Sequence, residues 1–245
     1  MRRERGAVLL IAFGVAAGVD LGSLAVGFDA GHVAAKPLLM PLLAAYAYTR
    51  GAPRPLIAAL LCGWGGDVLL LSDAEPAFLA GMGSFAVGHV CYLVLFGGPT
   101  GPTAPTGPGA PTGPGEPRRS GQTAYRVAFG AAYALALVVA VASLWPGLPT
   151  DLRLPVAGYS ALLTAMAWAA ARLGSVTGLG GALFVVSDML IATGVAEWPQ
   201  PPRPDLWIML TYLAAQYLLT RGVLNTLGTR PSSTPAEGGA SRHTV

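Results

Sequence analysis

The residues best equipped for chemistry in this sequence are ionisable side chains that stand inside long apolar stretches. They are few: Asp20, Lys36, Asp67, His89 and Asp188. A charged side chain costs roughly 2.5–3.5 kcal/mol at the centre of a membrane-spanning helix, so each is a candidate functional group. Asp67 and Asp188 are the strongest candidates because they lie well inside their stretches, whereas Asp20 and Lys36 lie near the ends and can reach interfacial water.

Two aspartates in one dry cavity would support acid–base catalysis. When both carboxyl groups are ionised they repel each other, so one retains its proton near neutral pH, beside a carboxylate. The same pair also suits a proton or cation pathway, so the residue types alone leave an enzyme and a transporter open. The Gly-x-Ser-x-Gly and His-Glu-x-x-His motifs of common hydrolases are absent from the sequence. Because only one of the three histidines lies inside an apolar stretch, we expect no metal site and no cofactor.

The composition identifies the elements that must position these groups. The 245 residues are 53% hydrophobic and 11% charged, with a mean hydropathy of +0.56. A water-soluble domain carries about 25% charged residues, so this surface must face lipid. In lipid only helices and closed barrels satisfy their backbone polar groups, and apolar stretches of about 20 residues have the length of a helix. We therefore expect an all-α, polytopic integral membrane protein.

The pattern predicts about eight transmembrane helices. Their expected ranges are 7–27, 34–50, 54–72, 76–97, 124–145, 153–173, 178–195 and 205–224. An even number places both termini on one side. The loops on that side carry most of the arginines, whereas the opposite loops carry only Arg153 and Arg203 together with most acidic loop residues. The positive-inside rule then predicts that both termini are cytoplasmic (N-in, C-in).

A segment rich in Pro, Gly and Thr, residues 98–123, divides the chain into two sets of four spans. Its composition predicts a disordered cytoplasmic linker between residues 1–97 and residues 124–227. The polar residues 228–245 predict a disordered C-terminal tail.

Counting along each expected helix predicts that the polar groups meet. Lys36, Asp67, His89, Asp188 and Gln216 all fall between the midplane and the outer third of the membrane. The interiors of the fifth and sixth spans are expected to hold no ionisable residue, so the polar groups cluster on spans one to four, seven and eight. The other spans are expected to bring their polar groups to one cavity.

Helical spacing makes two further predictions. Positions three and four apart share a face, so the fourth span should present one face made of Met82, Phe85, His89, Tyr92 and Phe96. In the first span, three glycines recur every four residues and predict close packing against another helix; they are Gly14, Gly18 and Gly22.

Five sequence strings resemble the YhhN family, which includes the mammalian lysoplasmalogenases. They occur in family order across nearly the whole membrane part. They are KPLLMPL at 36–42, GDVLL at 66–70, FxxGxxxFxxGHxxY at 78–92, SDML at 187–190 and YxxAQxL at 212–218.

The resemblance implies an eight-span membrane enzyme that hydrolyses the vinyl-ether bond of lysoplasmalogens. The products would be a fatty aldehyde and a glycerophospho-ethanolamine or -choline. The family's motif residues correspond here to Lys36, Asp67, His89, Tyr92, Asp188, Tyr212 and Gln216. We interpret Asp67 and Asp188 as catalytic, Lys36 as a ligand of the substrate phosphate, and the others as orienting groups. The partners implied are a lysophospholipid substrate and the bilayer.

Two other classes of protein stay open beside an enzyme. Asp67 and Asp188 each lie in the third span of their half, and a parallel repeat would favour a proton-coupled or small-solute transporter. A non-catalytic membrane scaffold would use the linker as its partner site. Nucleic acid is not an expected partner, because the basic residues are scattered over many loops. The Ala-, Gly-, Pro- and Arg-rich composition is typical of high-GC bacteria and predicts the bacterial inner membrane.

Overall fold

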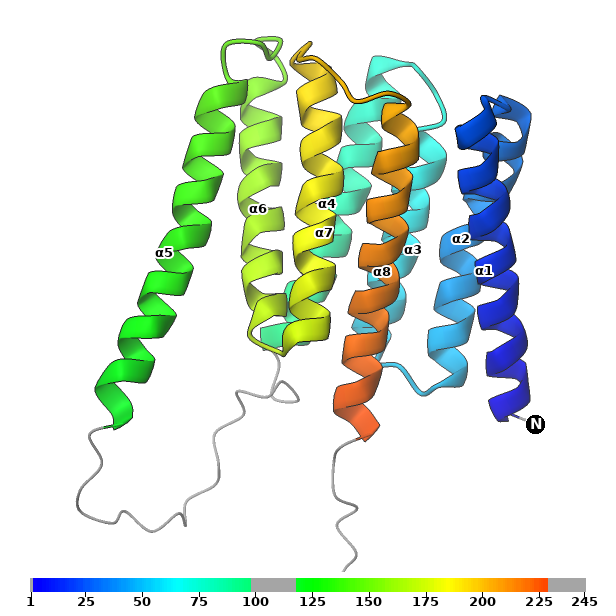
Figure 1. Ribbon diagram of the computed structural model, residues 1–245, viewed down its shortest axis with the longest axis horizontal. Helices are drawn as coiled ribbons and strands as arrows, with labels where there is room; N and C mark the ends of the chain where they lie inside the picture. Colours follow the sequence, from blue (N-terminus) through cyan, green and yellow to red (C-terminus); the bar gives the residue numbers. More distant parts are fainter. Residues whose placement is uncertain (1, 98–117, 229–245) are drawn as a thin grey trace, which may run out of the picture.

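The computed structural model describes the backbone of residues 2–97 and 118–228, and the side chains of residues 4–97 and 128–227. Within these residues the chain forms eight α-helices and no strand (Figure 1). The helices are α1 (Arg2–Val26), α2 (Asp29–Thr49), α3 (Arg54–Leu69), α4 (Glu75–Gly97), α5 (Arg118–Leu144), α6 (Arg153–Ala171), α7 (Ser175–Val195) and α8 (Pro204–Gly228). The expected helices are therefore present in order, although α5 begins at Arg118 rather than near residue 124.

Local sequence explains several helix ends. Gly27 and Gly51 follow α1 and α2 with φ angles of 76° and 77°. This left-handed conformation ends helices at little cost only for glycine. At α3, a proline in the first turn supplies the fixed φ that favours a helix start.

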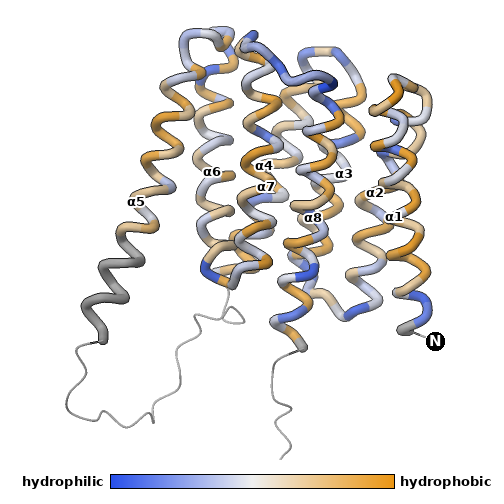
Figure 2. Tube along the Cα trace, viewed as in Figure 1, coloured by the Kyte–Doolittle hydropathy of each residue, from blue (hydrophilic) through white to orange (hydrophobic). Residues whose placement is uncertain are grey.

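Four helices are individually long and apolar enough to cross a membrane. They are the segments Glu4–Val26, Glu75–Gly97, Arg153–Ala171 and Ser175–Val195. The remaining helices lie in the same bundle, and Figure 2 shows apolar positions along all of them. Three of these, α2, α3 and α8, carry the buried polar residues Lys36, Asp67 and Gln216, which lower their hydropathy. The arrangement is that of a polytopic, all-helical membrane protein.

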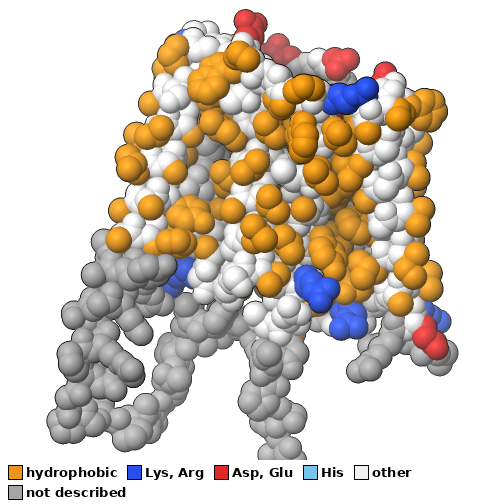
Figure 3. Space-filling model, in the orientation of Figure 1, with side chains coloured by type: hydrophobic (Ala, Val, Ile, Leu, Met, Phe, Trp, Pro, Cys, Tyr) orange, Lys and Arg blue, Asp and Glu red, His pale blue; other side chains and the backbone are white. Residues whose placement is uncertain are grey.

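The two ends of the bundle differ in charge. The start of α1 and the end of α8 lie at the same end of the bundle (Figure 1), as an even number of spans requires. Figure 3 shows apolar side chains over the middle of the visible face, acidic side chains mainly at the opposite end, and most basic side chains at the end with the termini. This distribution agrees with the expected N-in, C-in orientation. The expected linker and tail lie largely outside the described residues.

Glycines bring neighbouring helices into close contact. A Cβ added at Gly88 of α4 would lie 3.2 Å from the Ala59 carbonyl oxygen of α3. A Cβ at Gly180 of α7 would lie 2.9 Å from the Leu219 amide nitrogen of α8. The buried core joins α1, α2, α3, α4, α6, α7 and α8, whereas α5 packs chiefly against α6.

The glycine row of α1 does not take part in this close packing. A Cβ at any of Gly14, Gly18 and Gly22 would meet no atom within 4 Å. The prediction of close packing was therefore wrong within the described molecule. Its physical reason is rotational: α1 turns a different face to its neighbours, so Phe13, Ala16 and Asp20 are buried instead.

Candidate active site

A polar cavity of about 340 Å³ lies among α2, α3, α4, α7 and α8. Its walls include Lys36, Asp67, Asp188 and Tyr212. Gln200, in the α7–α8 connection, also lines it, so the cavity extends toward the end of the bundle opposite the termini. The polar groups of spans far apart in the sequence thus meet at one place.

A chain of hydrogen bonds holds Asp67. The Tyr212 hydroxyl donates to Asp67 Oδ2 at 2.9 Å, and Gln216 Nε2 donates to the Tyr212 oxygen at 3.3 Å. The Tyr92 hydroxyl then donates to Gln216 Oε1 at 2.7 Å. All four side chains are buried, and Asp67 is only 2% exposed. These three hydrogen bonds run in one direction and end on Asp67, so one oxygen of the carboxyl group is fixed in position.

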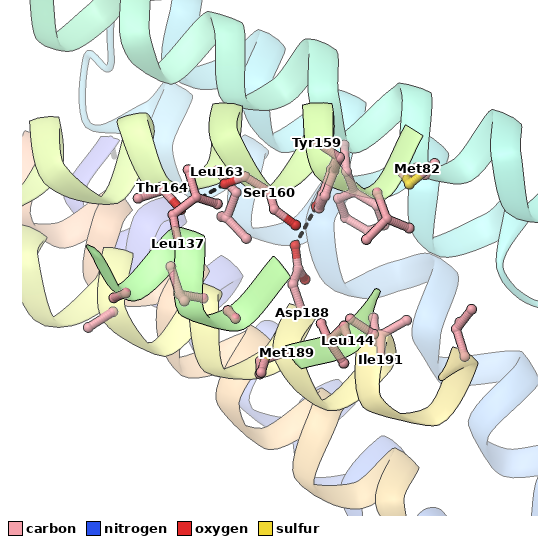
Figure 4. A pocket seen from close by; sticks show the side chains of 18 of the residues that line it. Met82, Leu137, Leu144, Tyr159, Ser160, Leu163, Thr164, Asp188, Met189 and Ile191 are labelled. Atoms are coloured by element: carbon pink, nitrogen blue, oxygen red, sulfur yellow. Dashed lines mark hydrogen bonds between the residues drawn. The ribbon is translucent and has the colours of Figure 1, made fainter. Parts of the chain in front are cut away.

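Asp188 is held by a different pair of residues. The Tyr159 hydroxyl of α6 donates to Asp188 Oδ2, and Figure 4 shows these two side chains pointing toward each other. His89 Nε2 lies 3.1 Å from the same tyrosine oxygen. Because the single hydroxyl proton points to Asp188, His89 must donate through Nε2–H. Its Nδ1 is buried and has no hydrogen-bond partner among the described residues, which agrees with this tautomer.

Aromatic rings separate the two hydrogen-bonded groups. Phe184 packs edge-on against His89 at 4.8 Å and against Tyr212 at 5.5 Å between ring centroids. Phe85 packs edge-on against Tyr212 at 5.8 Å. These rings lie between the Tyr212 hydrogen-bond chain and the His89 side chain.

Lys36 places a positive charge beside this cavity. Its side chain is 9% exposed, and it makes no hydrogen bond or salt bridge with any described residue. Asp67 and Asp20 lie close enough to interact with it electrostatically. Asp20 itself is bound by His32 Nδ1 at 2.8 Å. The ammonium group thus retains its three donors for an anion in the cavity.

A proline helps to hold α2 at this position. Pro41 has no N–H, so the carbonyl oxygen of Pro37, four residues earlier, loses its helical partner. The Trp64 indole of α3 donates to that oxygen at 2.9 Å. This bond ties the turn that carries Lys36 to the helix that carries Asp67.

Gly63 makes room for the Asp67 chain. A Cβ at this position would lie 2.9 Å from the Tyr212 hydroxyl oxygen and 3.1 Å from Gln216 Nε2. Only glycine lets the α3 backbone lie this close to both side chains.

A second, apolar pocket of about 370 Å³ adjoins the polar cavity. It lies among α4, α5, α6 and α7, and alanine and leucine side chains form most of its α5 wall. Residues that line both spaces join them; these are Leu70, Phe78, Phe85, Asp188, Ile191 and Val195. Asp188 is the one ionisable side chain among those six, so it stands where the polar and the apolar spaces meet.

The family model described as the YhhN family matches residues 31–223. The chain belongs to the YhhN family. The matched region contains every predicted site residue, so the resemblance inferred from the five sequence strings is confirmed.

Curated relatives of this YhhN protein carry the name lysoplasmalogenase. Lysoplasmalogenase TMEM86B of Homo sapiens is 33% identical over 177 residues, which cover 72% of this chain and 66% of that protein. The lysoplasmalogenase of Mycobacterium bovis is 32% identical over 190 residues, which cover 73% of this chain and 64% of that protein. The chain thus spans just under two thirds of the length of these two relatives. No solved structure matches this chain.

The structure brings together all seven residues predicted for the site. Four line the polar cavity, namely Lys36, Asp67, Asp188 and Tyr212. Behind them, Gln216 donates to Tyr212 and Tyr92 donates to Gln216. His89 bonds Tyr159, which in turn donates to Asp188. Among the described residues, no group of three or more His, Cys, Asp or Glu side chains is placed to hold a metal ion.

The helices α5 and α6 contribute to the site in ways that the sequence did not predict. Tyr159 of α6 holds Asp188, and α5 forms one wall of the apolar pocket. The expected clustering of the polar groups on the other six spans therefore left out Tyr159 of α6. A tyrosine carries a polar hydroxyl without a charge, so it gives no signal against an apolar background. Only the tyrosine's place on the α6 face toward α7 distinguishes it.

Proposed function

We propose that this YhhN protein is a membrane lipid hydrolase that cleaves the vinyl-ether bond of lysoplasmalogen-like lysophospholipids. The observation that carries the proposal is a pair of aspartates on one polar cavity, one of which also borders an apolar pocket. A lysophospholipid has a polar head, one reactive bond and one apolar chain. These parts match the polar cavity, the aspartate pair and the apolar pocket, respectively. The names of the relatives support the same reaction.

The position of the two aspartates divides their roles. A vinyl ether is protonated at the carbon farther from oxygen, on the side of the alkyl chain, and the product is an oxocarbenium ion. Asp188 borders the apolar pocket, so it is the acid that donates this proton. Asp67 lies on the polar side, near the Lys36 ammonium group, and we place the ether oxygen there. Its carboxylate is the negative charge that stabilises the cation, as in glycoside hydrolysis.

Water completes the reaction. It attacks the carbon next to the ether oxygen and gives its proton to the Asp67 carboxylate, which leaves a hemiacetal. The carbon–oxygen bond to glycerol then breaks, the hemiacetal hydroxyl gives up its proton to become the aldehyde carbonyl, and that proton passes to the glycerol oxygen. One water molecule is consumed. The proton given by Asp188 stays on the aldehyde chain, and the proton gained by Asp67 returns Asp188 to its acid form through the cavity water.

The remaining polar residues bind and orient. Lys36 binds the substrate phosphate as a point charge, because its three donors have no partner among the described residues. Tyr212 and Tyr159 each hold one aspartate by a hydrogen bond. We place the protein in the bacterial inner membrane with its cavity facing outward, because the cavity lies at the end opposite the arginine-rich end.

Purified protein incubated with a 1-alkenyl lysophospholipid tests this function. Mass spectrometry should detect fatty aldehyde from the wild type and far less, over the same time, from Asp67→Asn or Asp188→Asn. The matched substrate with a saturated ether bond should stay intact, since it has no carbon that can be protonated. In deuterated water one deuterium should appear on the aldehyde carbon next to the carbonyl.

No aldehyde from well-folded wild-type protein would overturn the proposal. Proton-coupled solute flux into proteoliposomes without any lipid product would support the transporter instead. Cleavage of the saturated ether would overturn the carbon-protonation mechanism while retaining a lipid hydrolase.

A further inference from the structure

The apolar pocket beside Asp188 has no role in the chemistry itself. Its lining is apolar apart from a few hydroxyl groups and Asp188. The Thr164 hydroxyl on its wall already donates to the Ser160 carbonyl oxygen at 2.7 Å, so it offers no free proton to a ligand. A volume of about 370 Å³ lies within the usual range for small-molecule sites. The pocket therefore suits an apolar ligand of moderate size.

We infer that this pocket holds the single alkyl chain of the lipid substrate, an inference that rests on the proposed function. Continuity is the first argument, because six residues line both the polar cavity and the pocket. A ligand bound in both spaces must place its polar–apolar junction beside Asp188. In a lysoplasmalogen that junction is the vinyl-ether bond.

The direction of the pocket is the second argument. It follows α7 from Val195 near the cavity mouth to Ala182, about 20 Å at 1.5 Å per residue. Asp188 lies between these ends, so the length between Asp188 and Ala182 is about 9 Å. A lipid of the outer leaflet has its head group at the outer surface, on the side of the mouth, and its chain toward the midplane. The pocket and the lipid thus run in the same direction.

The α5 wall is the third argument. Ala132, Ala136 and Ala140 recur every four residues and give this helix a smooth, narrow face toward the pocket. Because α5 packs chiefly against α6, it is the helix least tied to the bundle core, and Figure 1 shows it leaning away from α6 toward its first residues. Away from the pocket, α5 exposes the apolar side chains Leu135, Val138 and Val139, which suit contact with the bilayer. The part of a long chain that exceeds the pocket can pass there into lipid, and the single narrow slot favours one chain over two.

A pair of α5 variants tests the inference. Ala132→Phe fills the inner end of the pocket, whereas Ala134→Phe makes the same change two residues away, on the opposite face of the helix. Ala132→Phe should lower kcat/KM about tenfold for a long-chain alkenyl lysophospholipid, because pocket contacts discriminate chains to this extent. It should leave a short-chain substrate within about twofold of wild type, and Ala134→Phe should change neither substrate.

Equal losses for both chain lengths, or no loss for either, would overturn the chain site and leave the proposed function standing. A second measurement works even if no substrate is turned over. A saturated lysophosphocholine with a photoreactive diazirine in mid-chain should crosslink to residues 132–144 or 156–164, and Ala132→Phe should reduce that labelling. Labelling only of other helices would overturn the inference whatever the protein's activity.

Discussion

The surroundings of the two aspartates differ in three ways. Asp67 is 2% exposed and ends a buried chain of hydrogen bonds that runs through Tyr212, Gln216 and Tyr92. Asp188 is only partly buried, borders two spaces, and is held by Tyr159 alone among the tyrosines of the site. Lys36 lies near Asp67, whereas apolar side chains surround most of Asp188.

Within one helical bundle, the Asp67 side is therefore rigid and the Asp188 side is accessible to substrate. The Asp67 side is built from the core helices α3, α4 and α8, where close packing fixes each side chain. The Asp188 side is built from α6 and α7 beside the loosely packed α5. A carboxylate that only stabilises charge benefits from rigidity, whereas an acid that transfers a proton to carbon must touch the substrate.

The largest expected effects are the losses of turnover in the two aspartate variants, and these losses should differ in size. Asp188→Asn should lower the single-turnover rate of aldehyde release about 10³-fold, because an amide cannot donate the proton. Asp67→Asn should lower it about 10²-fold, since the charge is lost and the acid remains. Rapid-quench mass spectrometry with saturating substrate measures both rates. Circular dichroism and gel filtration in detergent serve as folding controls, and the reverse order of the two rates would exchange the assigned roles.

The next effect concerns the head-group side. Lys36→Met should raise KM about tenfold with little change in kcat, because the phosphate contact is the same in the ground state and the transition state. The matched substrate is a 1-alkenyl glycerol without phosphate, for which Lys36→Met should equal wild type. A similar loss on both substrates would mean that Lys36 supports Asp67 instead of binding phosphate.

The two tyrosines should respond in opposite ways. Tyr212→Phe leaves Asp67 and Gln216 buried without their shared partner, so unfolding should become easier by about 1–3 kcal/mol. Tyr159→Phe affects a carboxyl group that is only partly buried and lines a cavity, so the Tm of this variant should fall less. Its kcat should fall about tenfold as Asp188 loses its orientation. Measurements of Tm and kcat for both variants test this expectation. Equal changes in Tm and in kcat would remove the distinction between a rigid side and an accessible side.

The smallest expected effect tests the packing behind Asp67. Gly63→Ala adds a methyl group 2.9 Å from the Tyr212 oxygen, so Tyr212 must shift and turnover should fall a few-fold. Gly83→Ala is the control, because a Cβ there meets no atom within 4 Å. If the two alanine variants behave alike, the hydrogen-bonded chain tolerates movement and is not rigid.

Much of the fold and of the candidate site follows from local properties of the sequence. The helix ranges follow from apolar length, and the shared end of the termini follows from the arginine distribution. The face of α4 that carries Phe85, His89 and Tyr92 is buried as helical spacing predicts. Lys36, Asp67, Asp188 and Gln216 were identifiable because a polar group in lipid is costly wherever it lies.

The amino-acid sequence alone is therefore enough to predict a polytopic helical membrane protein. It also identifies most of the polar groups from which the site is built. Only the tertiary structure decided which faces of the helices meet. It left Gly14 without a close neighbour, brought Tyr159 to Asp188, and joined a polar and an apolar space at that aspartate. The physical reason is that apolar length acts locally along the chain, whereas the rotation of each helix about its axis depends on packing against partners distant in sequence.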